Sequence, residues 1–166
     1  MSKKILALSK LTQTEDEKLI EKIISLLDDT EIRVRGEVFS TLFLNKKNIS
    51  KKLVEGLSSQ SKNVRAFCLL ILANRNDKNE IDSILRLTND SSSMVRSCAF
   101  GALGHLRANI AKKEIHNGIF DSNIESKKSA AYALILINEN FTNEEKKELE
   151  RQSDSDFEKI LEKILN

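Results

Sequence analysis

The sequence contains no proline and no tryptophan, and its 166 residues include only five glycines and one tyrosine. A strand-rich fold usually depends on more turn-forming residues than this, whereas helices tolerate such a composition well. Cysteine is also scarce. Cys68 and Cys98 each lie in an apolar segment, so we expect both thiols to be reduced and packed in a core. The composition therefore favours an all-α fold.

Long apolar runs are missing too. The longest, Ala66–Ala73, is far shorter than the ~20 residues that a membrane-spanning helix needs. The N-terminal segment has no apolar stretch long enough for a signal peptide. With 40% hydrophobic and 31% charged residues, the chain has the composition of a globular protein. We therefore predict a cytoplasmic protein that does not enter a membrane.

Patterns that carry catalysis or bind metals are also lacking. His105 and His116 lie 11 residues apart, and neither they nor the cysteines have the short spacing of metal ligands. The sequence has no glycine-rich phosphate loop and no nucleophile elbow. Its carboxylates lie in segments of mixed charge, without an isolated pair suited to acid–base chemistry. We therefore expect a protein that is not an enzyme and that has no cofactor, metal or catalytic residue.

An internal repeat is the main positive feature. Three related segments each end in Val-Arg, and a degenerate fourth ends in Lys-Lys: Asp29–Arg35, Ser59–Arg65, Asp90–Arg96 and Ser122–Lys128. Their last residues are 30, 31 and 32 residues apart. Each segment follows a short apolar stretch and precedes an apolar-rich stretch of about four helical turns. A fixed period of this length is typical of helical repeat proteins.

Two helices per unit, a period near 30 and a turn of the form Asp-x-x-x-x-Val-Arg resemble the short HEAT-like repeat named after phycobilisome lyase subunits. The resemblance covers roughly residues 19–140. It implies an all-α, right-handed α-solenoid of about four to five antiparallel helix pairs with capping helices. The sequence departs from the pattern at Ser59, at Lys127-Lys128 and in having no proline in its turns. The repeat predicts the fold and says little about function.

Local signals set the expected boundaries of one solenoid domain over residues 1–166. Within it, we expect an N-terminal helix in 14–30, central repeats over 31–140 and a C-terminal cap over 141–166. Thr14 and Glu17 form a potential capping box. Further expected N-caps are Ser50, Asp77, Asn109 and Thr142. Helices are predicted near 3–11, 15–28, 31–44, 49–58, 63–74, 78–88, 93–107, 110–120, 124–138, 143–152 and 155–165.

The second helix of each repeat supplies the candidate binding surface, because second helices line the concave side in proteins with similar repeats. Large side chains recur five residues after the valine position. With residues of the adjacent groove, they give six candidate protein-binding residues: Phe39, Leu69, Leu70, Phe100, Tyr132 and Leu136. Large apolar side chains next to small ones are suited to anchoring a peptide or helix. The alternative is that Phe39, Leu69, Phe100 and Tyr132 pack between neighbouring repeats, and the sequence leaves both interpretations open.

A basic column follows the turns: Arg35, Arg65, Arg96 and Lys128. We interpret it as a structural ladder that pairs with the turn aspartates, because a guanidinium group fits a carboxylate with two hydrogen bonds. Phosphate binding by the same column is the alternative. The central residues 46–140 carry 15 basic and 9 acidic side chains, a net charge of +6, which is compatible with an anionic partner.

These features favour a non-catalytic protein–protein interaction module, such as an adaptor, an assembly factor or an accessory subunit. It would bind its protein partner through the concave groove or the solenoid ends. The alternative is a nucleic-acid-binding solenoid that uses the basic middle region. A third function, an enzyme accessory factor like the phycobilisome lyases, is implied by the resemblance alone. A homodimer formed through the groove or the C-terminal helix is compatible with each of these functions.

Overall fold

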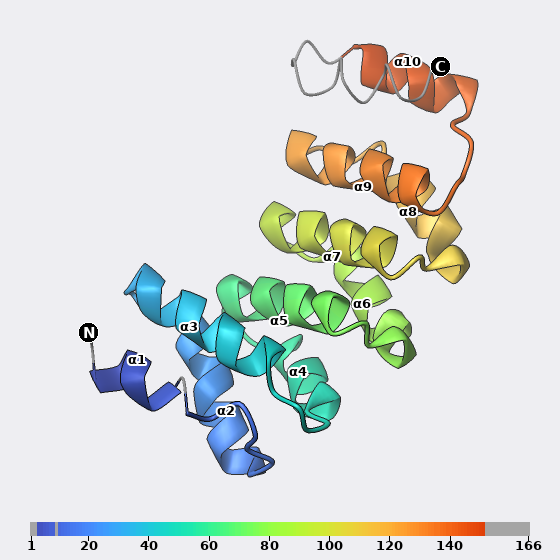
Figure 1. The fold of residues 1–166 in the computed structure, drawn as a ribbon. Coiled ribbons are helices and arrows are strands. Elements are labelled where there is room, and N and C mark those ends of the chain that lie inside the picture. The colour runs from blue at the N-terminus through green and yellow to red at the C-terminus, as the bar shows by residue number, and fades with distance from the viewer. Residues whose placement is uncertain (1–2, 9, 152–166) are drawn as a thin grey trace. The chain divides into compact units, whose positions relative to one another are not determined.

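The computed structural model describes residues 3–8 and 10–151, and every regular element in that part of the chain is a helix (Figure 1). The predicted helix near 155–165 lies outside the described residues. The α-helices are α1 (Lys3–Leu8), α2 (Glu17–Ser25), α3 (Ile32–Phe43), α4 (Ser50–Gly56), α5 (Lys62–Asn74), α6 (Ile81–Leu85), α7 (Ser93–His105), α8 (Lys112–Gly118), α9 (Ile124–Leu136) and α10 (Asn143–Glu150). Short 3-10 turns extend them: η1 (Leu26–Asp28), η2 (Lys78–Glu80), η3 (Arg86–Asn89) and η4 (Asn109–Ala111).

The chain divides into two compact units, and α6 contains the boundary between them. Unit 1 is Met1–Ser83 and unit 2 is Ile84–Asn166. The expectation of one domain over residues 1–166 stays a prediction.

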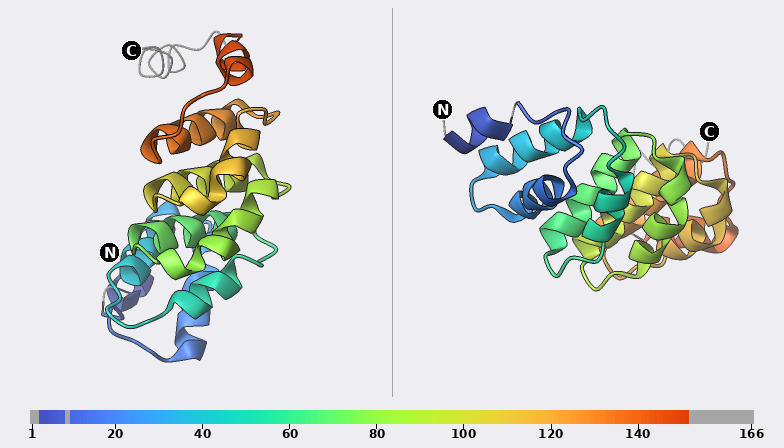
Figure 2. Two further views of the ribbon diagram at one scale, coloured as in Figure 1. Left: turned by 90° about the vertical axis from the view of Figure 1, so that its right-hand side faces the viewer. Right: turned by 90° about the horizontal axis from the view of Figure 1, so that it is seen from below.

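Unit 1 contains two helix pairs, α2 with α3 and α4 with α5, and α1 packs against α3 (Figure 2). The apolar side of α2 is made by Ile20, Ile23, Ile24 and, in the following turn, Leu27, all of which are buried. Their spacing of three and four residues places them on one side of the helix. The α1–α3 contact includes a hydrogen bond in which the Thr41 hydroxyl donates to a carbonyl oxygen of α1.

In unit 2, the second helices α7 and α9 lie side by side (Figures 1 and 2). A Cβ atom placed on Gly104 of α7 would lie 2.7 Å from the Cα atom of Ala133 on α9. The missing side chain is therefore what allows the two backbones to approach so closely. One end of this contact is fixed by the hydroxyl groups of Ser97 and Ser129, which are 2.8 Å apart.

The turn before each second helix repeats one hydrogen bond four times, and this fixes the repeat register. A side-chain oxygen accepts from the backbone N–H two residues later, over 2.8–3.2 Å, at Asp29, Ser59, Asp90 and Asp121. A second helix begins three residues after each of these positions. The turn segment of the fourth repeat therefore starts at Asp121, and the residue equivalent to the arginines is Lys127. The predicted register, which placed Lys128 in that column, is wrong by one residue.

The cause of the error is a polar residue in a core position. Ser126 stands where the other repeats have Val34, Val64 and Val95, and it is fully buried. Its hydroxyl donates to the carbonyl oxygen of Ser93 at 3.2 Å, so the buried polar group is satisfied. No apolar side chain marks this point of the repeat in the sequence.

The ends of the second helices confirm the corrected register. Asn76, Arg107 and Asn138 have φ angles of 58°, 55° and 59°, the left-handed conformation that commonly ends a helix. They follow one another at 31-residue intervals. Each lies twelve residues after the core position of its repeat, and in the fourth repeat this holds only if that position is Ser126.

The predicted N-caps are partly right. Thr142 is the N-cap of α10, as predicted, and it also forms a full capping box with Glu145. The capping box predicted at Thr14 is wrong, because Asp16 caps α2 and accepts from the N–H of Leu19 at 3.1 Å. Asp77 precedes η2 as predicted, whereas two other expected N-caps are the first residues of their helical segments, Ser50 and Asn109.

Candidate functional site

The six candidate binding residues divide into a buried and an accessible group. Leu69 is fully buried and Phe100 is 2% exposed, so both belong to the core and a partner cannot reach them. Phe39 is half-buried and packs against the rings of Phe43 and Phe67, with centroid distances of 6.3 and 6.4 Å. The column five residues after the valine is therefore a packing column, and the prediction that Leu69 and Phe100 anchor a partner is wrong.

The accessible column lies one residue further along each second helix. In the corrected register it consists of Ser40, Leu70, Gly101 and Tyr132, which are exposed except for the half-buried Leu70. Tyr132 is 40% exposed, and Leu136, one turn later on α9, is 37% exposed. The one-residue error had placed Tyr132 in the packing column, whose true member in the fourth repeat is the buried Ala131.

In unit 2 these residues form an apolar surface on the second helices, which we call the α7–α9 face. It comprises Met94 and Gly101 of α7 and Tyr132 and Leu136 of α9, and Met94 is 39% exposed. A Cβ atom placed on Gly101 would meet no other heavy atom within 4 Å. Space above this glycine is therefore open.

The arginine column closes the turns of its own repeats. The guanidinium Nη1 atoms of Arg35, Arg65 and Arg96 donate to the carbonyl oxygen six residues earlier, at 2.7, 2.8 and 2.9 Å. Arg96 also donates from Nε and Nη2 to the two carboxylate oxygens of Asp121, at 2.7 and 2.8 Å. This second contact joins the third repeat to the fourth, and the role of the whole column as a structural ladder stays a prediction.

The fourth position of the column behaves differently. Lys127 pairs with Glu148 and so attaches α9 to α10. Lys128, which the sequence had placed in the column, pairs with Glu125 of its own helix at 3.3 Å. A lysine cannot form the paired hydrogen bonds of a guanidinium group, so the ladder changes its chemistry here.

Five of the ten lysines of the basic middle region form ion pairs with carboxylates. Lys52 lies 3.1, 2.5 and 2.8 Å from carboxylate oxygens of Glu17, Glu21 and Glu55, and these contacts raise the pKa of Lys52 above its usual range. Further pairs are Lys47–Glu15, Lys112–Glu139, Lys127–Glu148 and Lys128–Glu125. The positive charge counted in the sequence is therefore partly compensated locally.

One histidine of unit 2 joins two helices. His116 of α8 places its Nδ1 atom 2.6 Å from a carboxylate oxygen of the buried Glu145 on α10. Burial raises the pKa of the Cys68 thiol to about 12, so this cysteine is protonated at neutral pH.

Within residues 3–8 and 10–151, no three His, Cys, Asp or Glu side chains gather in a way that would hold a metal ion. In the same part of the chain, every helix is too short or too polar to cross a membrane.

The repeat geometry agrees with a comparison against known families. A family model of HEAT repeats matches residues 50–135, just over half of the chain. The chain belongs to the HEAT-repeat family. A search of curated proteins found no significant match to this HEAT-repeat protein.

Solved structures show the same repeat-solenoid fold at low sequence identity. An engineered protein is 18% identical, with a TM-score of 0.59 and coverage of 99% of this chain and 96% of its own. A designed armadillo repeat protein in complex with the peptide (KR)4 is 16% identical, with a TM-score of 0.58 and coverage of 97% and 90%. A computationally designed armadillo repeat protein for modular peptide recognition is 17% identical, with a TM-score of 0.59 and the same coverages.

Proposed function

We propose that this HEAT-repeat protein is a non-catalytic protein-interaction module that binds a segment of a partner protein on the α7–α9 face. The observation that supports it is the presence of the exposed apolar side chains Met94, Tyr132 and Leu136 on the same two helices as the open position Gly101. Exposed apolar surface costs free energy in water, and a partner that covers it removes this cost. Adaptor, assembly and accessory-subunit roles are all compatible with such a surface.

The side chains of the face are suited to a peptide or helix as the partner. Tyr132 offers a large ring and a hydroxyl group, a combination that is enriched among the residues that dominate binding energy. The absence of a side chain at Gly101 leaves room for a partner's own side chain or backbone. A designed armadillo repeat protein of similar fold binds a peptide, which supports the same kind of partner here.

Nucleic-acid binding through the basic middle region is the weaker hypothesis. Phosphate binding depends on lysine and arginine side chains that are free to replace counterions. Five lysine ammonium groups of this region already form ion pairs with carboxylates: Lys47, Lys52, Lys112, Lys127 and Lys128. A phosphate backbone would have to compete with those carboxylates.

The test is capture of partners from the native extract with the tagged full chain, followed by mass spectrometry. Gly101→Arg places a long charged side chain on the α7–α9 face without a steric clash. Its matched control is Gly36→Arg on α3, a position where an added Cβ atom also has no neighbour within 4 Å. We expect protein companions that resist high salt and nuclease, that persist with Gly36→Arg and that disappear with Gly101→Arg.

A quantitative arm uses the purified companion and Tyr132→Ala. Truncation of a central aromatic anchor usually costs about 2 kcal/mol or more, which corresponds to a Kd roughly thirtyfold higher. Companions that are retained by Gly101→Arg would exclude the α7–α9 face. Recovery of nucleic acid alone, lost at high salt, would favour the alternative instead.

A further inference from the structure

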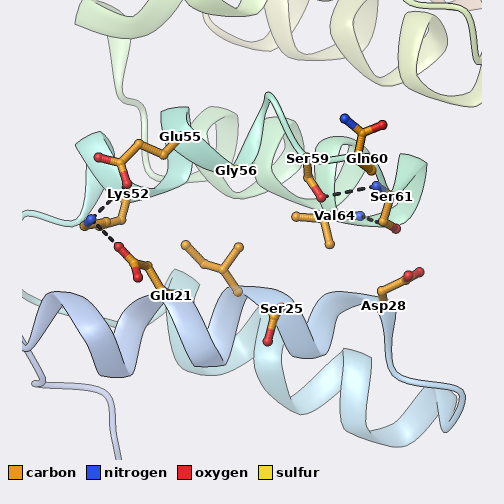
Figure 3. A pocket seen from close by; sticks show the side chains of 11 residues that line it. Glu21, Ser25, Asp28, Lys52, Glu55, Gly56, Ser59, Gln60, Ser61 and Val64 are labelled. Atoms are coloured by element: carbon orange, nitrogen blue, oxygen red, sulfur yellow. Dashed lines mark hydrogen bonds and ion pairs between the residues drawn. The ribbon is translucent and has the colours of Figure 1, made fainter.

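Unit 1 contains a cleft of about 690 Å³ between the first helices α2 and α4, closed on one side by the turn before α5 and by Val64 of α5 (Figure 3). Its floor includes Ile24 and Val64, both buried, and the backbone at Gly56. Polar side chains line its two ends, and Ser25 lies along α2 between them. The cleft is therefore apolar in its middle and polar at both ends.

One end carries more negative than positive charge. Here Lys52 is surrounded by Glu17, Glu21 and Glu55, of which the last two line the cleft. Three carboxylates around one ammonium group leave a net charge of −2. Each carboxylate contacts Lys52 through one oxygen and is 46–63% exposed, so its other oxygen is accessible to a second cation.

The other end carries Asp28. Its carboxylate accepts a hydrogen bond from the side-chain amide of Asn63 at 2.7 Å. This bond lowers the pKa of Asp28, and a hydrogen bond from Ser61 and the positive charge of Arg35 lower the pKa further. Partial burial acts in the opposite direction and raises the pKa. Asp28 is therefore ionised at neutral pH. Arg35 itself donates to the carbonyl oxygen of Asp29. Its positive charge therefore reduces the negative potential at this end of the cleft, while its side chain does not occupy the cleft.

The two ends are separated by a length that a short chain can span. Glu21 and Asp28 are seven residues apart along α2 and η1, which corresponds to roughly 10–12 Å at the rise of α- and 3-10 helices. Buried Ile24 lies between them. The order along the cleft is acidic, apolar and acidic.

Position 59 distinguishes this cleft from the corresponding region of unit 2. In unit 2, the space between the third and fourth repeats shares the glycine and turn positions of this cleft but is not lined by α6. It is only about 370 Å³ and is crossed by the Arg96–Asp121 pair. In unit 1 the residue equivalent to Asp121 is Ser59, which has no carboxylate for Arg35 to bridge to. The wider cleft thus coincides with the repeat in which the turn aspartate is replaced.

We propose that the α2–α4 cleft binds a linear ligand with an ammonium group at each end, a polyamine-like α,ω-diammonium chain. Its methylene groups lie along Ile24 and Val64, one ammonium group binds Glu21 and Glu55, and the other binds Asp28. Exposed ion pairs are individually weak and a few buried methylene groups add to them, so the expected Kd is roughly 0.1–1 mM. The proposal concerns unit 1 and does not depend on partner binding by the α7–α9 face.

The direct test titrates the full chain with 1,8-diaminooctane, followed by calorimetry and by backbone amide chemical shifts. Two ligands serve as controls: 1,8-octanediol has the same length without charge, and 1,4-diaminobutane has the charges at too short a separation. We expect saturable binding of the long diamine with shifts centred on Gly56, Ser59 and Ser61. Both control ligands should bind at least about tenfold more weakly, and added salt should weaken diamine binding.

Variants then assign the ends of the ligand. Asp28→Asn and Glu21→Gln should each weaken diamine binding roughly twofold to fivefold, the effect of one exposed ion pair. Asp82→Asn removes an exposed carboxylate of unit 1 outside the cleft and should have no effect. Ser25→Trp fills the middle of the cleft without a change of charge and should abolish binding. Thermal unfolding of each variant confirms that it is folded.

Several results would overturn the proposal. One is the absence of saturable binding up to about 10 mM diamine. Another is binding of the diol as tightly as the diamine, and a third is an equal loss of diamine affinity with Asp28→Asn and Asp82→Asn. Shifts centred on unit 2 would also exclude the α2–α4 cleft. If the diamine binds but Gly101→Arg retains every companion, the proposed function is wrong and the cleft ligand stands. If the diamine does not bind but Gly101→Arg loses the companions, the cleft ligand is wrong and the proposed function stands.

Discussion

The two inter-repeat clefts are built from equivalent parts and differ in what fills them. In each, the first helix of the later repeat ends at a glycine, Gly56 in unit 1 and Gly118 in unit 2. A Cβ atom on Gly56 would meet the Sγ atom of Cys68 at 2.6 Å. On Gly118 it would meet the ring of Phe100 at 2.5 Å and the Cβ atom of Ala130 at 2.7 Å.

The aromatic residue of the packing column explains part of this difference. In unit 2, Phe100 is buried, lines the cleft and contacts Gly118. Its equivalent in unit 1, Phe39, is half-buried and packs against Phe43 and Phe67 instead. One inter-repeat space is therefore occupied by the protein's own ring and ion pair, while the other remains open. A repeat can conserve its turn geometry and still leave a cavity when one ring and one carboxylate change.

The largest expected effect comes from the glycines. Gly118→Ala forces a methyl group against a buried ring and a neighbouring helix, and we expect a loss of about 2–3 kcal/mol in unfolding free energy. Gly56→Ala should cost less, about 1–2 kcal/mol, because its nearest neighbour is one sulfur atom at the end of a short side chain. Urea unfolding of both variants measures the difference.

A double variant and a matched control sharpen this comparison. Cys68→Ala removes the sulfur atom, so Gly56→Ala should cost less in that background than in the natural chain. Gly101→Ala, on the open α7–α9 face, should instead stabilise the protein by up to about 1 kcal/mol through helix propensity. Equal losses for Gly56→Ala and Gly118→Ala would mean that the ring of Phe100 does not distinguish the two clefts.

The second effect concerns the ion pair that crosses the unit 2 cleft. Asp121→Asn replaces a carboxylate that accepts two hydrogen bonds from Arg96, and we expect a loss of about 1–2 kcal/mol at neutral pH. Urea unfolding at pH 7 measures this loss. Arg96→Lys is the companion variant and should lose a similar amount, because an ammonium group cannot form the paired contact.

The pH dependence of Asp121→Asn gives an independent check. Burial alone would raise the pKa of Asp121, but hydrogen bonds from Arg96 and from the N–H of Asn123, with the charges of Arg96 and Lys127, outweigh it and lower the pKa. A lowered folded-state pKa contributes stability that is present above the unfolded value of about 3.9 and is lost as the pH falls through the folded value. The stability difference between the natural chain and Asp121→Asn should therefore be constant from pH 7 to about 5 and shrink below about pH 4. A difference that stays constant at acidic pH would contradict a role for the charged pair.

The repeat and the fold class followed from the sequence because three turns carry the same residues. Asp29, Asp90 and the Val-Arg pairs after them are strong local signals, and Ser59 can replace an aspartate since its hydroxyl accepts the same backbone N–H. The fourth register was missed because Lys127 and Lys128 are both basic, and Ser126 provides no apolar residue at the valine position that would distinguish them. The aspartate at 121, six residues before Lys127, was the signal that would have found it.

The candidate site was less predictable, because adjacent columns of one helix differ only in the neighbours that they meet. Leu69 is buried and Leu70 is half-buried, yet both are leucines in the same apolar run. Only the position of the neighbouring helices separates packing from surface. The α2–α4 cleft was not predicted at all, since it depends on contacts between Lys52 and carboxylates that lie 31 and 35 residues earlier in the chain.

The smallest expected effect transplants the unit 2 carboxylate into unit 1. Ser59→Asp keeps the hydrogen bond from the N–H of Ser61 and offers Arg35 a carboxylate equivalent to Asp121. We expect it to be about 0.5 kcal/mol more stable at pH 7 than Ser59→Asn, which keeps the turn without the charge. Urea unfolding of the two variants at pH 7 and pH 3 measures the difference, which should disappear at pH 3 where the new carboxylate is protonated. If the two variants are equally stable at pH 7, Arg35 does not reach position 59, and the openness of the α2–α4 cleft must come from Phe39 and Gly56 rather than from the missing aspartate.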